Sequence, residues 1–247
     1  MDFADYCREF EREGERLVAR VPECDVDAAV PGCPEWRVGD LLAHVGSVHR
    51  WVRHLVAVRA TRRISPRDMD FARGPVGAPW LAEGVADLLA TFAAHDEHEP
   101  MWAWGADQHV GFWARRMLHE TLVHRLDLDA ATGVAAEVDA SIAADAIDEF
   151  LVNLGPAAAF SPTVANLVGE DEVIAFVTEG GPTWLVGLTP RGFAVIEESS
   201  RIDAALRGSP LDVLLTLYRR RTLEGSSCAL EGRRDLLERW WDNSALP

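Results

Sequence analysis

The sequence predicts two domains, an N-terminal helical bundle followed by a smaller α+β domain. Along most of the first 155 residues, apolar residues recur at intervals of three and four, which is the period of amphipathic helices. After about residue 165, short runs rich in β-branched and aromatic residues take over. The segment GPAAAFSPT between these regions contains two prolines and is the expected joint. We therefore predict domains at residues 1–156 and 165–247.

The first domain is expected to consist of helices bounded by residues that favour helix ends. Pro79 suits the start of the third helix, Gly133 suits the end of the fourth, and Gly155 followed by proline ends the fifth. The expected helical segments are residues 5–21, 33–60, 79–100, 107–133 and 139–155.

The second domain is expected to form a hairpin meander and then two strand–helix units. Residues 173–198 contain three β-rich runs separated by the turn sequences EGGP and TPRG. In residues 200–221 a strand leads into a helix with Ser209 as its N-cap and Pro210 as its first residue, and residues 226–246 repeat this pattern. A small, mostly antiparallel sheet follows from this order.

The composition limits the partners that the chain can bind. It has 24 Lys+Arg and 40 Asp+Glu, a formal charge of −16, which repels nucleic acid and anionic membranes. Two basic segments, residues 61–67 and 219–221, could receive an anionic ligand or be plain surface. The acidic start has no secretory leader, and no run approaches the roughly 18 apolar residues of a membrane span. We therefore expect a cytoplasmic protein whose four cysteines, which lack CxxC spacing, are free thiols.

The fourth expected helix carries a glutamate and two histidines in the segment MLHETLVHRLD. The zinc-protease motif HExxH needs histidines four residues apart, whereas His119 and His124 are five apart and about 140° apart around a helix. Glu120 and His124 are four residues apart, about 40° around the helix, so they can reach the same point. The segment is therefore not a protease motif but could supply two metal ligands.

A third ligand is available in the second expected helix. His44, in the segment LLAHVGSVHRW, lies among leucines and valines of the apolar stripe and is expected inside the bundle, where an imidazole needs a polar partner. His44, Glu120 and His124 form a candidate metal site contributed by two helices. Two simpler interpretations remain open, a surface pair of Glu120 with His124 and a core His44 bonded to a carbonyl. His49 and His54 are expected at the surface or behind the ligands.

The two helical segments also resemble a known family. CPEWRVGDLLAH and HETLVHRLD fit the patterns C-P-x-W-x-V-x-D-L-x-x-H and H-E-x-x-x-H-R-x-D of the mycothiol-dependent maleylpyruvate isomerase family. The resemblance implies a DinB-like four-helix bundle followed by a sterol-carrier-like α+β domain. It places the family's metal ligands on His44, Glu120 and His124. It also implies zinc and mycothiol, although two histidines and a carboxylate would equally suit Fe²⁺.

The resemblance implies chemistry on a small thiol and a small electrophilic substrate. A metal ion deprotonates a bound thiol at neutral pH, and the thiolate is a nucleophile. In the isomerase, the thiolate adds to a cis double bond, the resulting single bond rotates, and the thiol leaves. In S-transferase relatives the thiol stays on the product. A non-catalytic metal-binding or ligand-binding protein is the remaining alternative.

An anionic substrate or thiol needs positive charge near the metal. Arg125, next to a ligand, is predicted to bind the thiol cofactor. The family uses an arginine from its C-terminal domain, and the catalytic candidates are Arg219, Arg220 and Arg221. Their alternative role is to stabilise a helix C-terminus. Asp127 could orient a ligand imidazole, and Trp36 is expected to pack at the start of the second helix.

Overall fold

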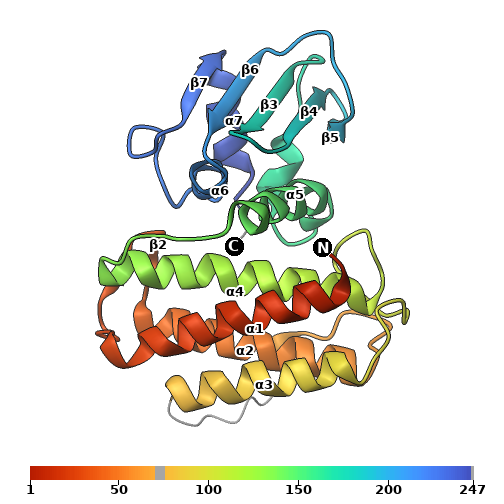
Figure 1. Cartoon of the computed structure of the whole chain (residues 1–247). Coiled ribbons are helices and arrows are strands. Elements are labelled where there is room, and N and C mark those ends of the chain that lie inside the picture. The colour runs from red at the N-terminus through yellow and green to blue at the C-terminus, as the bar shows by residue number, and fades with distance from the viewer. Residues whose placement is uncertain (70–75, 246–247) are drawn as a thin grey trace. The chain divides into compact units, whose positions relative to one another are not determined.

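The computed structural model describes residues 1–69 and 76–245 (Figure 1). The chain forms two compact units, Met1–Ala136 and Glu137–Pro247. The first is helical apart from a small ribbon, and the second combines a sheet with helices, which confirms the predicted fold class. Among the helices of the described residues, none has the length and apolar content that crossing a membrane requires.

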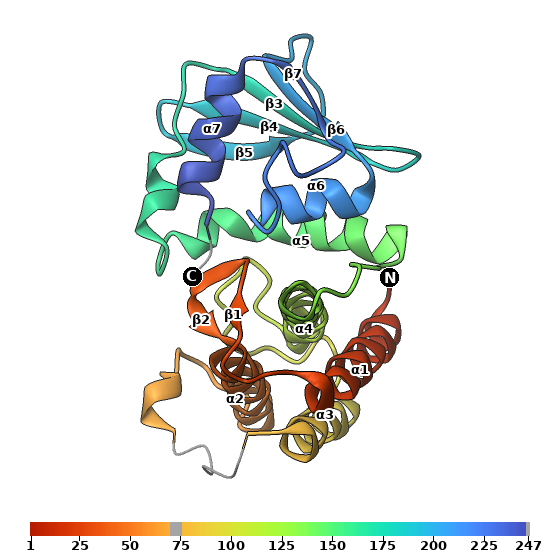
Figure 2. The same cartoon turned by 90° about the vertical axis from the view of Figure 1, so that its left-hand side faces the viewer.

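The first unit is a four-helix bundle. Its helices are α1 (Phe3–Arg20), α2 (Val38–Ala57), α3 (Ala78–Ala93) and α4 (Val110–Thr132). Helix α1 packs against α3 and α4, and α2 packs against the same two helices, so the four close into a ring that Figure 2 shows end-on. Short 3-10 helices lie in the connections at Val21–Glu23 and Pro66–Asp68.

Local hydrogen bonds define the ends of these helices. At the start of α1, the backbone N–H of Asp5 donates to Asp2 Oδ1 at 2.8 Å, and the N–H of Asp2 donates to Asp5 Oδ2 at 3.2 Å. At the end of α4, Gly133 has φ +71°, a left-handed conformation that glycine adopts without steric cost. The predicted end of the fourth helix is therefore confirmed.

A two-stranded antiparallel ribbon precedes α2, where a helix was expected. Its strands are β1 (Ala29–Val30) and β2 (Cys33–Arg37). Trp36 lies on β2, so the expectation that it opens the second helix was wrong. The reason is local, because Pro34 keeps the residue before it extended and has no N–H for a strand or helix bond.

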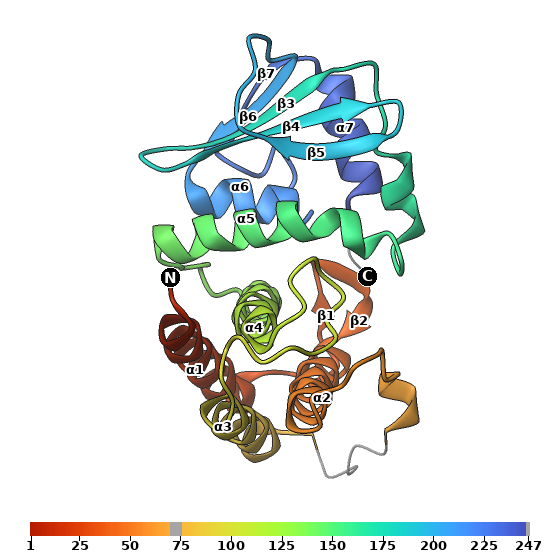
Figure 3. The same ribbon diagram turned by 90° about the vertical axis from the view of Figure 1, so that its right-hand side faces the viewer.

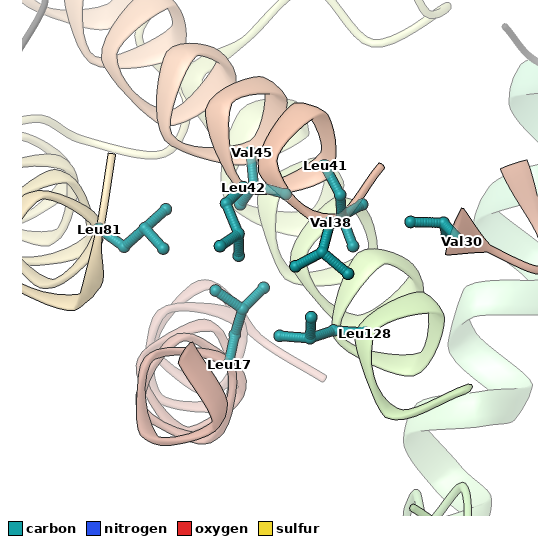
Figure 4. Packing of buried hydrophobic residues seen from close by; sticks show 8 residues of the cluster. All are labelled: Leu17, Val30, Val38, Leu41, Leu42, Val45, Leu81 and Leu128. Carbon is teal, nitrogen blue, oxygen red and sulfur yellow. The ribbon is translucent and has the colours of Figure 1, made fainter. Parts of the chain in front are cut away.

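Eight buried side chains from all four helices and from β1 form the core of the bundle (Figure 4). Each is at most 1% exposed. Burial of apolar surface contributes about 25 cal/mol per Å², so this cluster holds α2 and α4 together. Its members are Leu17, Val30, Val38, Leu41, Leu42, Val45, Leu81 and Leu128.

The described part of the second unit contains a five-stranded sheet and three helices (Figure 3). The strands are β3 (Val173–Thr178), β4 (Thr183–Thr189), β5 (Gly192–Ile196), β6 (Ala204–Gly208) and β7 (Ala229–Gly232). The helices are α5 (Ala140–Ala157), α6 (Pro210–Leu217) and α7 (Arg234–Asn243), with a 3-10 helix at Pro162–Asn166. Helix α6 begins as predicted, since Ser209 Oγ accepts a hydrogen bond from the N–H of Asp212 at 3.1 Å.

The strand order is β5-β4-β3-β6-β7. Neighbouring strands are antiparallel except for the parallel pair of β3 and β6, so the sheet is mostly antiparallel, as predicted. The helices lie on one face of the sheet in Figure 3. On this face the ring of Trp240 in α7 lies 5.4 Å from Phe176 and 5.5 Å from Phe193, which anchors α7 to β3 and β5.

The division between the units lies before α5, whereas we expected the first domain to span residues 1–156 and the second residues 165–247. Helix α5 packs against α6 and β5, and the ring of Phe150 lies 4.7 Å from that of Tyr218. Its apolar stripe therefore belongs to the second core. Helical periodicity predicts that a helix buries one face, but it does not identify the element that covers that face.

His49 is buried inside the bundle, so of its two expected positions, at the surface or behind the ligands, the surface position was wrong. His49 is 0% exposed, and its Nε2 lies 2.8 Å from Thr121 Oγ1. Its ring packs edge-on against Phe10, with 5.2 Å between the ring centres. Burial lowers the pKa of His49 to about 3, because a charged imidazole would lose its hydration there. The folded chain therefore holds this side chain neutral.

Acid should destabilise the fold through His49. Between an unfolded pKa of 6.5 and a folded pKa of about 3, only the unfolded chain binds a proton at this residue. As the pH is lowered below 6.5, the free energy of unfolding should therefore decrease by about 1.4 kcal/mol for each pH unit. His49→Gln should remove this contribution, which urea unfolding from about pH 7 to about pH 5 would measure. The exposed His98→Gln is the control, and equal pH dependence of wild type and His49→Gln would contradict the prediction.

Candidate metal centre

Three side chains from two neighbouring helices converge in the first unit. His44 lies on α2, and Glu120 and His124 lie one turn apart on α4. His44 Nε2 is 2.9 Å from Glu120 Oε1, and His124 Nε2 is 3.3 Å from the same oxygen. One ligand atom from each residue lies within 4.8 Å of the others. The fold therefore brings together the three residues predicted as metal ligands.

The site lies at the rim of the bundle. The side chains of His44, Glu120 and His124 are 31%, 15% and 9% exposed. His44 was expected inside the core, but the fully buried line of α2 passes through Leu41, Val45 and His49, and His44 lies beside it. The cluster is therefore accessible from the side of α2 and enclosed on the side of α4.

An open hollow of about 530 Å³ borders His44. Its lining residues are Glu35, Trp36, Asp40, Ala43, His44 and Ser47, with no lysine or arginine among them. The ring of Trp36 lies 4.8 Å from that of His44 and 5.9 Å from that of His124. Trp36 therefore packs against both imidazoles and forms part of the approach to them.

Two further side chains orient the cluster. Asp127 Oδ2 lies 3.1 Å from His124 Nδ1, as its predicted orienting role requires, and a proton on Nδ1 leaves Nε2 as the free ligand atom. Arg116, one turn before Glu120 on α4, donates from Nη2 to Glu120 Oε2 at 2.5 Å. Cys33 Sγ lies 3.9 Å from Asp127 Oδ2, which links β2 to the same network.

Charge interactions outweigh burial at both residues of α4. Burial alone would raise the pKa of Glu120, but the neighbouring His124 and Arg116 hold this pKa well below its usual range. Burial alone would lower the pKa of His124, but Glu120 and the hydrogen bond with Asp127 raise it to about 9. At neutral pH the two side chains therefore form an ion pair, whose proton a divalent cation would replace.

The donor set fits a divalent metal ion. Two imidazole nitrogens and one carboxylate oxygen are ligands of catalytic zinc sites and of non-haem Fe²⁺ sites. Three protein ligands would leave at least one coordination position for an exogenous ligand. The simpler interpretations fit less well, because a surface pair on α4 does not account for His44, whose Nε2 faces Glu120.

Both units match models of one protein family. Residues 7–129 match the mycothiol maleylpyruvate isomerase N-terminal domain, and residues 141–239 match the C-terminal domain of the same family. The chain belongs to the mycothiol-dependent maleylpyruvate isomerase family. Two crystal structures of mycothiol-dependent maleylpyruvate isomerase, one of a mutant, share the fold with TM-scores of 0.57 and 0.58. Each is 12% identical in sequence to this chain. The matched region covers 93% of this chain and 93% of the chain in each crystal structure. No curated protein matches the sequence.

Arg125, predicted to bind the thiol cofactor in this family member, is directed elsewhere. It is 3% exposed, its Nε lies 2.7 Å from Glu13 Oε2, and its Nη1 lies 2.6 Å from Asp129 Oδ2. One residue after His124, a side chain points about 100° further around the helix, which here means toward α1. Arg125 therefore pairs α4 with α1, and these contacts give no support to the cofactor contact, which stays a prediction.

The three candidate arginines of the second unit follow the end of α6. Arg221 forms an ion pair with Asp212, whereas Arg219 and Arg220 each donate from Nη1 to a backbone carbonyl, at 3.2 and 3.0 Å. Arg219 is exposed. The carbonyl contact of the exposed Arg219 does not neutralise its guanidinium, so positive charge is available at this residue. A role for Arg219, Arg220 or Arg221 in the reaction remains a prediction.

Sequence reasoning missed Arg116 and misjudged Trp36. Arg116 lies four residues before Glu120, the same spacing that linked Glu120 to His124, so helical periodicity could have identified it. No local pattern could place Trp36 or Cys33 beside the ligands. Both lie on β2, which reaches α4 only in the folded bundle.

Cys7, Cys24 and Cys228 are poor candidates for the nucleophile. All four lie in the described residues and none forms a disulfide, as predicted. Burial raises the pKa of the Cys7 thiol to about 11, and it also raises the pKa of Cys24 and Cys228. These three side chains are therefore neutral thiols near pH 7, and a thiol is a much weaker nucleophile than a thiolate.

Asp127→Asn should lower the pKa of His124 in chelator-treated protein. The amide replaces a carboxylate, so the pKa should fall from about 9 by about one unit, measured by NMR titration of the ring. A raised pKa stabilises the fold below the unfolded value of 6.5 and this stabilisation is lost as pH rises toward 9. The variant should therefore lose less stability than wild type over that range. Asp87→Asn, on the exposed side of α3, is the control, and an unchanged His124 pKa in Asp127→Asn would contradict the prediction.

Proposed function

We propose that the chain is a metal-dependent enzyme that activates mycothiol for addition to a small electrophilic substrate, as in the cis–trans isomerisation of maleylpyruvate. His44 Nε2, Glu120 Oε1 and His124 Nε2 would hold one divalent cation, with zinc as the proposed metal. The observation that carries the proposal is the convergence of these three atoms on two helices of a chain that belongs to this family.

The residues around the ligands fit this role. A bound divalent cation would lower the pKa of a thiol so that the thiolate forms at neutral pH. Two neutral imidazoles and one carboxylate cancel only part of a double positive charge, so the site would still attract an anionic sulfur. Asp127 keeps the Nε2 of His124 available, and Trp36 restricts the approach of water to the imidazoles from β2.

The hollow beside His44 is unfavourable for an acidic substrate. Its charged lining residues are the carboxylates of Glu35 and Asp40, which would repel an anion. The carboxylates of maleylpyruvate would need cations from another part of the chain. Arg219, Arg220 and Arg221 are the proposed source, with Arg219 the most exposed of them.

Metal content tests the ligand set directly. His44→Ala and Glu120→Ala should each reduce bound zinc by about tenfold or more, because each removes a ligand that the others cannot replace. Elemental analysis of the purified proteins measures this. His54→Ala is the matched control, since His54 lies on the same helix outside the cluster. Equal metal content in wild type, His44→Ala and Glu120→Ala would contradict the assignment.

Product analysis separates isomerisation from S-transfer. With maleylpyruvate and a small amount of mycothiol, we expect the trans isomer to accumulate while the thiol is recovered, because addition is followed by expulsion of the thiol. Chromatography with mass detection distinguishes the isomer from a thioether, and a reaction without mycothiol is the control. A thioether that consumes mycothiol would identify an S-transferase instead. Bound metal with no reaction on either path would favour a non-catalytic protein.

A further inference from the structure

We propose that Arg116 restricts Glu120 to coordination through one oxygen and so keeps a metal position open for the thiol. This inference rests on the proposed function, since it concerns the same metal centre. Arg116 acts through Glu120 and is therefore a positioning residue.

The contacts of Glu120 divide between its two oxygens. Oε1 lies 2.9 Å from His44 Nε2 and 3.3 Å from His124 Nε2, so it is the oxygen that belongs to the ligand cluster. Oε2 accepts a hydrogen bond from Arg116 Nη2 at 2.5 Å. A guanidinium bonded to a carboxylate is a strong, charge-assisted pair. The bond from Arg116 therefore engages one of the two lone pairs of Oε2 and places a positive charge beside this oxygen, which opposes its approach to a metal cation.

Arg116 is held firmly in this position. Its side chain is 8% exposed, and it lies one turn before Glu120 on the same helix. Its guanidinium carbon lies 6.0 Å from the ring centre of Trp104, which comes from the loop between α3 and α4. An ion pair that is largely shielded from water is weakened little by solvent, and breaking it would remove a charge-assisted hydrogen bond from Oε2. Rotation of Oε2 away from Arg116 toward a metal is thus unfavourable.

The coordination mode of Glu120 decides how many positions remain. With one oxygen from Glu120 and two imidazoles, a tetrahedral cation has one position left for a thiol. With both oxygens bound, that position is filled or the geometry expands. Arg116 therefore favours the arrangement in which a small thiol binds without displacing a protein ligand.

Cobalt(II) reports this difference, because tetrahedral Co²⁺ absorbs visible light far more strongly than Co²⁺ with five or six ligands. Wild-type protein loaded with Co²⁺ should give the strong spectrum, and Arg116→Met should give a weaker one with similar Co²⁺ content. Titration with mycothiol should show thiol binding weakened about tenfold or more in Arg116→Met. Arg116→Lys, which keeps one donor and the positive charge, should restore much of the wild-type spectrum. Arg115→Met is the matched control, since Arg115 lies one residue away and faces Tyr6.

Identical cobalt spectra and thiol affinities in wild type and Arg116→Met would overturn this inference while leaving the metal site intact. Wild type that binds neither Co²⁺ nor Zn²⁺ would overturn the proposed function itself. If Arg116→Met does not fold, X-ray absorption of the wild-type zinc protein decides the matter. One oxygen from Glu120 in a four-coordinate site would support the inference, and two oxygens would overturn it.

Discussion

The candidate site depends on the position of one partly buried carboxylate. Glu120 presents Oε1 to the imidazoles of His44 and His124 and Oε2 to Arg116. An unpaired carboxylate in apolar surroundings would cost several kcal/mol, so its neighbours must be cations, donors or a metal. Each partner is fixed in turn, as His124 is by Asp127. Moving α2 relative to α4 would therefore disturb the whole network.

The apolar core supplies the rigidity that this network needs. The cluster drawn in Figure 4 joins α2 and α4 through close-packed leucines and valines, and a packed core transmits small displacements rather than absorbing them. A buried hydrogen bond between His49 and Thr121 also joins α2 to α4. The polar site is thus built at the rim of a dry bundle, with its open side at His44 and the adjoining hollow.

Charge is distributed unevenly over this acidic chain. The hollow beside the candidate ligands carries the carboxylates of Glu35 and Asp40 as its charged groups, which makes it unfavourable for an anion. Arg125, close in sequence, is engaged in ion pairs with Glu13 and Asp129 and contributes to the stability of the bundle. Positive charge for an anionic substrate would have to come from residues outside this hollow.

The sequence by itself determined the features that lie within one helix or one turn. These include the i,i+4 pair of Glu120 and His124, the end of α4 at Gly133 and the start of α6 at Ser209. The geometry of a single helical turn or helix cap sets each of them, independently of the elements that pack against the helix. The same logic would have reached Arg116. Tertiary structure alone decided that His44 borders solvent, that Trp36 packs against the ligands, that Arg125 turns toward α1, and that α5 joins the second unit. Each of these depends on which apolar helix or strand faces pack against one another. Segments far apart in the sequence have similar apolar patterns, so the sequence pattern alone does not identify the packing partners.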